Sequence, residues 1–193
     1  MNYFSSTARR LAAIAVGAAG AGLIVTTAAF ATTSSPSART SAASAPACTA
    51  FSLGVWVAVG QGNGAAGTIY YPLEFTNLSG HTCSLFGFPG VSAIDGHGNQ
   101  LGSSANWEHT TSPRTVTLAP GATAHTMLAY HDAAVTTEPG CDPVNSATLL
   151  KVYPPGQHRW TYAAYDFQSC SRSGVRYLSI VGPIVPGVGT VNG

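Results

Sequence analysis

Charged residues are scarce in this chain of 193 residues. Asp, Glu, Lys and Arg make up 8% of it, against about 25% in an average soluble domain. The formal net charge is +1, so there is no basic excess to neutralise nucleic-acid phosphates, and we expect no nucleic-acid partner. This composition also argues against a coiled coil and a collagen-like chain.

The motifs of several enzyme classes are missing too. No C-x-x-C spacing predicts a zinc site, and no G-x-S-x-G marks a nucleophile elbow, since Gly90–Ile94 lacks the final glycine. The seven acidic residues form no evident catalytic pair. We therefore expect no enzymatic activity, no catalytic residues and no cofactor.

The first residues form an export signal. Arg9 and Arg10 precede the apolar run Leu11–Val25, and Ala29-Phe30-Ala31 supplies an A-x-A cleavage site. We predict a signal peptide at residues 1–31 and a secreted protein, with the cell envelope as a possible location. The alternative is an uncleaved anchor over Leu11–Ala31, which is just long enough to span a bilayer.

The rest of the chain divides by composition. Residues 32–47 contain no large apolar side chain and read as a disordered Ser/Thr/Ala/Pro linker. The folded domain is expected over residues 48–185, followed by a flexible tail at 186–193. After signal cleavage, we expect no stable membrane span.

Four cysteines, at positions 48, 83, 141 and 170, predict two disulfides in an exported chain. Four cysteines allow three pairings, and the sequence does not decide among them. Short loops favour Cys48–Cys83 and Cys141–Cys170. Each loop would stabilise the fold by about 3–4 kcal/mol in the chain-entropy model.

Apolar residues alternate with a period of two, which predicts strands. The alternation is clearest at 51–59 and 69–75, and it returns at 123–130, 148–153, 159–165 and 176–184. No window has the 3.6-residue stripe of a helix. The prediction is an all-β fold: an immunoglobulin-like β-sandwich of about eight or nine short strands with two disulfides.

Two glycine-rich segments resemble ligand motifs. Gly62–Gly67 matches G-x-G-x-x-G, but a strand containing Pro72 follows it instead of a helix, so we predict a hairpin loop. Asp95, His97 and Asn99 resemble part of a calcium loop, but too few carboxylates follow, so a tight turn is expected.

Two further patterns could bind a ligand. His125, Met127 and His131 share one face of a predicted strand, and imidazole with thioether is a plausible copper ligand set. Four aromatic residues could form a stacking platform for sugars: Trp107, Trp160, Tyr162 and Tyr165. For each pattern, the alternative is an ordinary strand face or cross-strand partners.

Several segments together resemble the exported domain of unknown function 4232 family of actinobacteria. The resemblance covers about residues 48–182 and rests on Cys48, Gly64–Asn77, Thr82–Val91, Leu118–Ala124 and Leu150–Gly156. It implies a secreted or surface-tethered β-sandwich with no established activity and no catalytic residues to transfer. Many relatives are lipoproteins, but this chain lacks the lipobox cysteine, so that tether is not carried over.

The expected function is accordingly a non-enzymatic binding or structural role in the cell envelope or the extracellular medium. Its partner would be a cell-wall glycan or another envelope protein. The alternatives are an envelope copper-binding protein that uses His125, Met127 and His131, and a carbohydrate-binding module.

Overall fold

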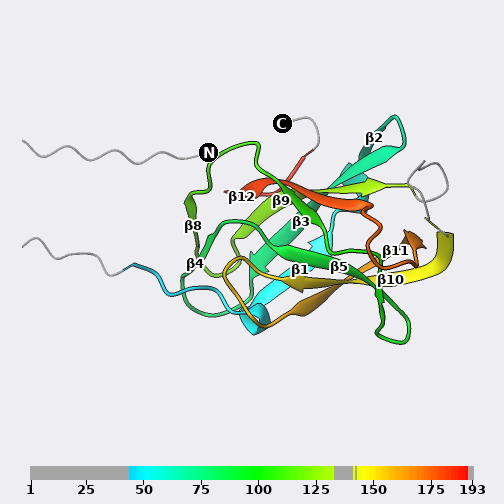
Figure 1. Ribbon diagram of the computed structural model, residues 1–193. Helices are drawn as coiled ribbons and strands as arrows, with labels where there is room; N and C mark the ends of the chain where they lie inside the picture. Colours follow the sequence, from blue (N-terminus) through cyan, green and yellow to red (C-terminus); the bar gives the residue numbers. More distant parts are fainter. Residues whose placement is uncertain (1–43, 133–140, 142, 191–193) are drawn as a thin grey trace, which may run out of the picture. The chain divides into compact units, whose positions relative to one another are not determined.

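The computed structural model describes residues 44–132, 141 and 143–190 (Figure 1). The expected signal peptide, linker residues 32–43 and tail residues 191–193 lie outside the described residues.

The described residues form three β-sheets and two 3-10 turns, η1 (Ala50–Ser52) and η2 (Val59–Gln61). In the largest sheet the strand order is β1-β3-β9-β12-β7, with β2 also paired to β3. These strands are β1 (Leu53–Val57), β2 (Asn63–Ala65), β3 (Thr68–Asn77), β7 (Asn106–Glu108), β9 (Thr123–His131) and β12 (Leu178–Pro186).

A second sheet has the order β11-β10-β5-β6, and a third consists of β4 and β8. The bounds are β4 (Cys83–Phe86), β5 (Gly90–Asp95), β6 (Gln100–Leu101), β8 (Thr115–Leu118), β10 (Pro143–Tyr153) and β11 (Thr161–Cys170). The all-β prediction is confirmed. Twelve strands are present in the described residues instead of eight or nine, because β2, β6 and β7 are only two or three residues long. The immunoglobulin-like assignment stays a prediction.

One hydrophobic core joins the three sheets. Inward-facing residues alternate along the strands, as the buried Val116 and Leu118 of β8 show. Residues from every sheet belong to the same cluster, among them Leu73, Phe75, Leu128 and Ile180 from the largest sheet, Val91, Leu150 and Val152 from the second, and Leu85, Val116 and Leu118 from the third. This shared core is the arrangement of a β-sandwich.

Tyr177 is the largest fully buried side chain of the core. Its hydroxyl donates to the Leu101 carbonyl at 2.9 Å and accepts from the Ser169 hydroxyl, so the buried polar tip is satisfied. Gly102 leaves room for the ring, because a Cβ at that position would overlap it; the residue also has a φ of +61°. Desolvation by burial is the main cause that raises the pKa of Tyr177, to about 12.

The structure joins Cys48 to Cys83 and Cys141 to Cys170, the pairing that short loops favoured. The Cα atoms lie 4.9 Å and 4.8 Å apart, within the usual range for disulfides. Cys83 lies on β4 opposite Leu118 of β8, so the first disulfide ties the start of the domain to the smallest sheet.

Ordered structure extends beyond the limits expected for the domain. Before Cys48, Ala47 forms a parallel bridge with Ser84 of β4. After residue 185, Gly187 donates its N–H to the Thr123 carbonyl at 2.9 Å. Neither segment has the alternating apolar side chains that predict a strand. Both are held by main-chain hydrogen bonds, which cannot be predicted from amino-acid composition.

We predict that replacing Cys48 and Cys83 together by Ala lowers the free energy of unfolding by about 3–4 kcal/mol, because the unfolded chain regains the freedom of a loop with a sequence separation of 35. Urea unfolding at neutral pH measures the loss. The double variant of Cys141 and Cys170, with a separation of 29, is the matched comparison and should lose a similar amount. A loss below about 1 kcal/mol in both would contradict this account of the fold.

Candidate functional site

The proposed copper ligands lie along one strand but do not converge. His125, Met127 and His131 alternate on β9, and six residues of strand separate the two histidine Cα atoms by about 20 Å. His125 Nδ1 lies 2.8 Å from the Gly187 carbonyl oxygen, and His131 Nδ1 lies 2.8 Å from the Thr68 hydroxyl. One ion therefore cannot take all three side chains as ligands.

Register places Glu74 opposite His125 on the face that carries the histidine. The segment after β12 covers this carboxylate, because the Gly189 N–H donates to Glu74 Oε1 at 2.8 Å and leaves the side chain without exposed surface. Glu74 Oε2 has no hydrogen-bond partner among the described residues. Burial raises the pKa of the Glu74 carboxyl, and the Gly189 N–H and the nearby His125 offset part of that rise.

Gly189 fits tightly over this carboxylate. A Cβ there would lie 2.6 Å from both Pro72 Cβ and His125 Cδ2, closer than real Cβ contacts. The residues that follow β12 therefore form a close-fitting strap over β3 and β9. The sequence reasoning missed Glu74, because the alternation marks it only as an outward-facing position.

The four candidate stacking residues do not form one platform. Tyr165 is buried and contacts the rings of Tyr71, Tyr130 and Phe167 at centroid distances of 5.4, 6.4 and 4.8 Å. Trp107 lies on β7 in the other main sheet, where it stacks on Phe88 and donates to the Pro89 carbonyl. Neither belongs with Trp160 and Tyr162.

Trp160 and Tyr162 form the centre of an exposed patch of aromatic and cationic side chains. Their ring centroids lie 4.7 Å apart, and 40% and 42% of their surfaces are exposed. Lys151 lies directly opposite Tyr162 on β10, and its Nζ sits 4.9 Å from the Trp160 ring centroid. We call this group, together with Phe51, Tyr153 and Arg159, the Trp160 patch.

Cation–π contacts orient both cations of the Trp160 patch. Lys151 Nζ also lies 5.5 Å from the Tyr153 ring, and the Arg159 guanidinium lies 5.8 Å from the ring of Phe51. Phe51 is 77% exposed. With His158, three of these residues line a shallow hollow of about 520 Å³ at the edge of the patch: Phe51, Arg159 and Trp160.

The hairpin predicted at Gly62–Gly67 is present, but its turn is shorter than expected, because Asn63–Ala65 form strand β2. Ala66 and Gly67 join β2 to β3 with φ values of 50° and 81°, which a two-residue hairpin requires. The segment from Asp95 to Asn99 is a tight turn, as predicted. Asp95 accepts hydrogen bonds from the N–H groups of His97 and Asn99 and from the Asn99 side chain, so protein donors occupy both of its oxygens. The Asn99 side-chain hydrogen bond is the main cause that lowers the pKa of Asp95.

Asn77 has a structural task. Its buried amide donates to the carbonyls of His81 and Leu118 at 2.9 and 3.0 Å, and its oxygen accepts from Ser79. It therefore fastens the end of β3 to the end of β8.

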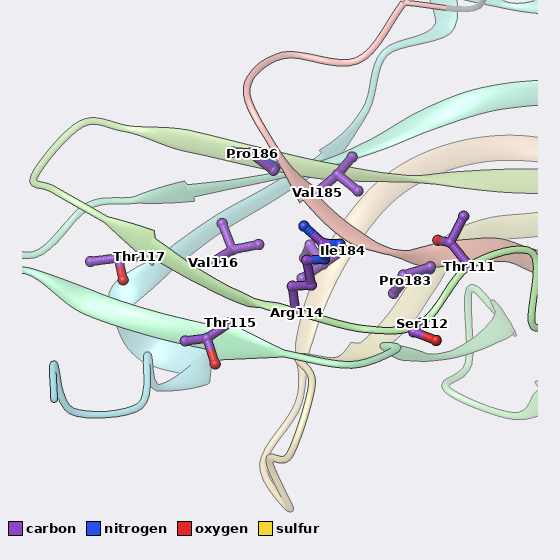
Figure 2. Close-up of a pocket in the computed structure, with 10 residues that line it drawn as sticks. All are labelled: Thr111, Ser112, Arg114, Thr115, Val116, Thr117, Pro183, Ile184, Val185 and Pro186. Atoms are coloured by element: carbon purple, nitrogen blue, oxygen red, sulfur yellow. The ribbon is translucent and has the colours of Figure 1, made fainter.

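A groove lies between β8 and the second half of β12, with a volume of about 780 Å³. Figure 2 shows β8 and β12 as its two walls, with Arg114 near Ile184. It is lined by Thr111, Ser112, Arg114, Thr115, Val116, Thr117, Pro183, Ile184, Val185 and Pro186. The sequence reasoning did not find this groove, which two strands far apart in the chain create.

Within the part of the chain that the structure describes, no three His, Cys, Asp or Glu side chains gather closely enough to hold a metal ion. No helix in the same residues is long and apolar enough to cross a membrane.

The fold and these surfaces define a disulfide-linked all-β domain with exposed candidate binding faces. A family model described as domain of unknown function (DUF4232) matches residues 48–179, and the chain belongs to this family. The match agrees with the resemblance seen in the sequence. Comparisons with curated proteins and with solved structures find no match.

We predict that Glu74→Gln gains stability over the wild type as pH rises. A raised folded-state pKa means that the folded protein keeps the proton more tightly, so the stability from protonated Glu74 is present below the unfolded pKa of about 4.3 and is lost as pH rises through the folded value. The Gln side chain is neutral at every pH, so the variant does not lose this stability as pH rises. Urea unfolding at pH 4 and pH 7 should show the variant gaining on the wild type at pH 7.

Glu108→Gln, which removes an exposed carboxylate on β7, is the control and should show no such gain. If the free energies of unfolding of Glu74→Gln and the wild type differ by the same amount at pH 4 and pH 7, burial is not the dominant influence on the pKa of Glu74.

Proposed function

We propose that this protein is an exported, non-enzymatic binding domain that holds an anionic glycan of the cell envelope on the Trp160 patch. The observation that carries the proposal is the exposed pair of Trp160 and Tyr162 with Lys151 against it. Large aromatic side chains exposed together on a soluble domain are a mark of a binding surface.

The chemistry of the Trp160 patch suits a sugar that bears a carboxylate or a phosphate. Aromatic faces pack against the apolar face of a sugar ring, and the two rings are tilted by 51°, so they offer two differently oriented surfaces. Lys151 and Arg159 supply positive charge beside these rings. The ring contacts of both cations restrict their motion, which lowers the entropic cost of binding.

A location outside the cytoplasm is supported by the predicted export signal and by the disulfides. Disulfides persist in oxidising compartments and are rare in the cytosol. Glycans of the cell envelope are accessible to a protein in that location.

A non-enzymatic role is supported by the different surroundings of Glu74 and Asp95, the two carboxyls of the described residues whose pKa values are shifted. Glu74 lies beneath the strap that follows β12, and Asp95 is held in a tight turn by Asn99. Active sites usually bring perturbed titratable groups together in one cleft.

The test is binding of the full mature chain to an insoluble anionic cell-wall polysaccharide, measured by co-sedimentation over a range of polysaccharide concentrations. We expect Trp160→Ala to weaken binding about tenfold, which corresponds to ~1.4 kcal/mol. Lys151→Gln should weaken binding to the anionic polysaccharide but not to a neutral polysaccharide such as cellulose.

Trp56→Ala is the matched control, because Trp56 is similarly exposed at 42% but lies on β1 in the other main sheet. It should leave binding unchanged. No binding of the wild type to the polysaccharide, or equal losses in Trp56→Ala and Trp160→Ala, would overturn the proposal.

A further inference from the structure

The groove between β8 and β12 exposes one free strand edge. On β4, Ser84 directs both main-chain groups away from β8: its N–H donates to the Pro46 carbonyl, and its carbonyl accepts from the Cys48 N–H. Ser84 pairs with Thr117. Main-chain groups alternate in direction along an antiparallel strand, so those of Thr117 and Thr115 point away from β4, toward the groove.

These groove-facing groups are two N–H donors and two carbonyl acceptors, and none has a hydrogen-bond partner among the described residues. An unpaired strand edge of this kind is a template for another strand. The side chains of Thr115 and Thr117 are exposed, whereas those of Val116 and Leu118 enter the core.

Proline prevents β12 from closing the groove. Pro183 and Pro186 have no N–H, and the N–H of Ile184 between them donates to the Gly87 carbonyl at 2.9 Å. This half of β12 therefore has few donors with which to form a ladder with β8. An incoming chain would hydrogen-bond to β8 and pack against the apolar wall of Pro183, Val185 and Pro186.

The β8 wall is held in place before any ligand arrives. Asn77 donates to the Leu118 carbonyl at 3.0 Å, and Leu118 lies opposite Cys83 of the first disulfide. Because the edge is already ordered, binding does not have to order it. The volume of about 780 Å³ is within the range of ligand clefts, about 300–1,000 Å³.

The charge of Arg114 indicates which kind of peptide the groove would bind. Arg114 is the one charged side chain among the described residues that line the groove, and no acidic residue of the described chain is paired with it. Guanidinium groups bind carboxylates through paired hydrogen bonds. A peptide that carries an acidic side chain complements this end of the groove.

We propose that the groove binds an extended segment of a partner protein, which adds as a strand to the free edge of β8 and places an Asp or Glu side chain at Arg114. This is peptide recognition by β-strand addition, in which main-chain hydrogen bonds supply affinity and side-chain contacts supply specificity. The surface is separate from the Trp160 patch, so the two proposals stand independently.

The test uses a phage-displayed library of random eight-residue peptides selected on the full mature chain. The most enriched peptide is then synthesised, and its Kd is measured by fluorescence polarisation. We expect the enriched peptides to carry an acidic residue. Thr117→Pro removes one groove-facing N–H that the fold does not use, and it should weaken binding about tenfold. Thr117→Val, which keeps that N–H, should weaken binding much less than Thr117→Pro.

Two further comparisons keep the result independent of folding. The peptide has two alternate sets of N–H groups, and only one set can face β8. N-methylation of that set should abolish binding to the unaltered protein, whereas N-methylation of the other set should not. Arg114→Gln should weaken binding of the acidic peptide about tenfold, but it should leave unchanged the binding of a peptide in which Asn or Gln replaces the acidic residue. Arg172 is an exposed arginine outside the groove, and Arg172→Gln should have no effect on binding. No enriched peptide, or binding insensitive to both Thr117→Pro and N-methylation, would overturn the proposal.

Discussion

Burial of alternate apolar side chains from three sheets in one core is the constraint on which the rest of the structure depends. Because charged residues are few, ion pairs contribute little to holding the layers together, and the shared core and the two disulfides carry that task. The core uses the inner face of each strand, so the outer faces and the strand edges are what remains for contact with other molecules. The Trp160 patch lies on an outer face, and the groove lies at an edge.

Local restrictions on hydrogen bonding then shape these surfaces. Proline in β12 removes the donors that would join it to β8, and the small sheet of β4 and β8 is instead fixed by Asn77 and the first disulfide. On the other side of β12, the strap that ends in Gly189 seals Glu74 against His125. The same strand thus leaves one edge open while the residues that follow it close a face.

Much of the fold could be predicted because it follows from local pattern. Period-two alternation identified the main strands, and loop length favoured the disulfides that the structure contains. The turn at Ala66 and Gly67 followed from glycine content and the strand after it. Each of these features depends on residues that are close in sequence or on simple chain statistics.

The candidate sites were harder to predict from the sequence, because they depend on the register between strands that are far apart in the chain. Only pairing of β3 with β9 brings Glu74 to His125, and only the order of the sheets separates Trp107 on β7 from Trp160 beside β11. The copper hypothesis failed to account for strand length, which spreads His125 and His131 too far apart for one ion. The free edge of β8 becomes visible only when the partners of Ser84 are known.

The most direct test of the account is mass spectrometry of the natural protein, recovered separately from the cytoplasm, the cell envelope and the medium, with thiols alkylated before digestion. The account predicts a chain outside the cytoplasm that begins at Thr32 and has no alkylated cysteine. A cytoplasmic chain with its original amino terminus and four alkylated cysteines would contradict it.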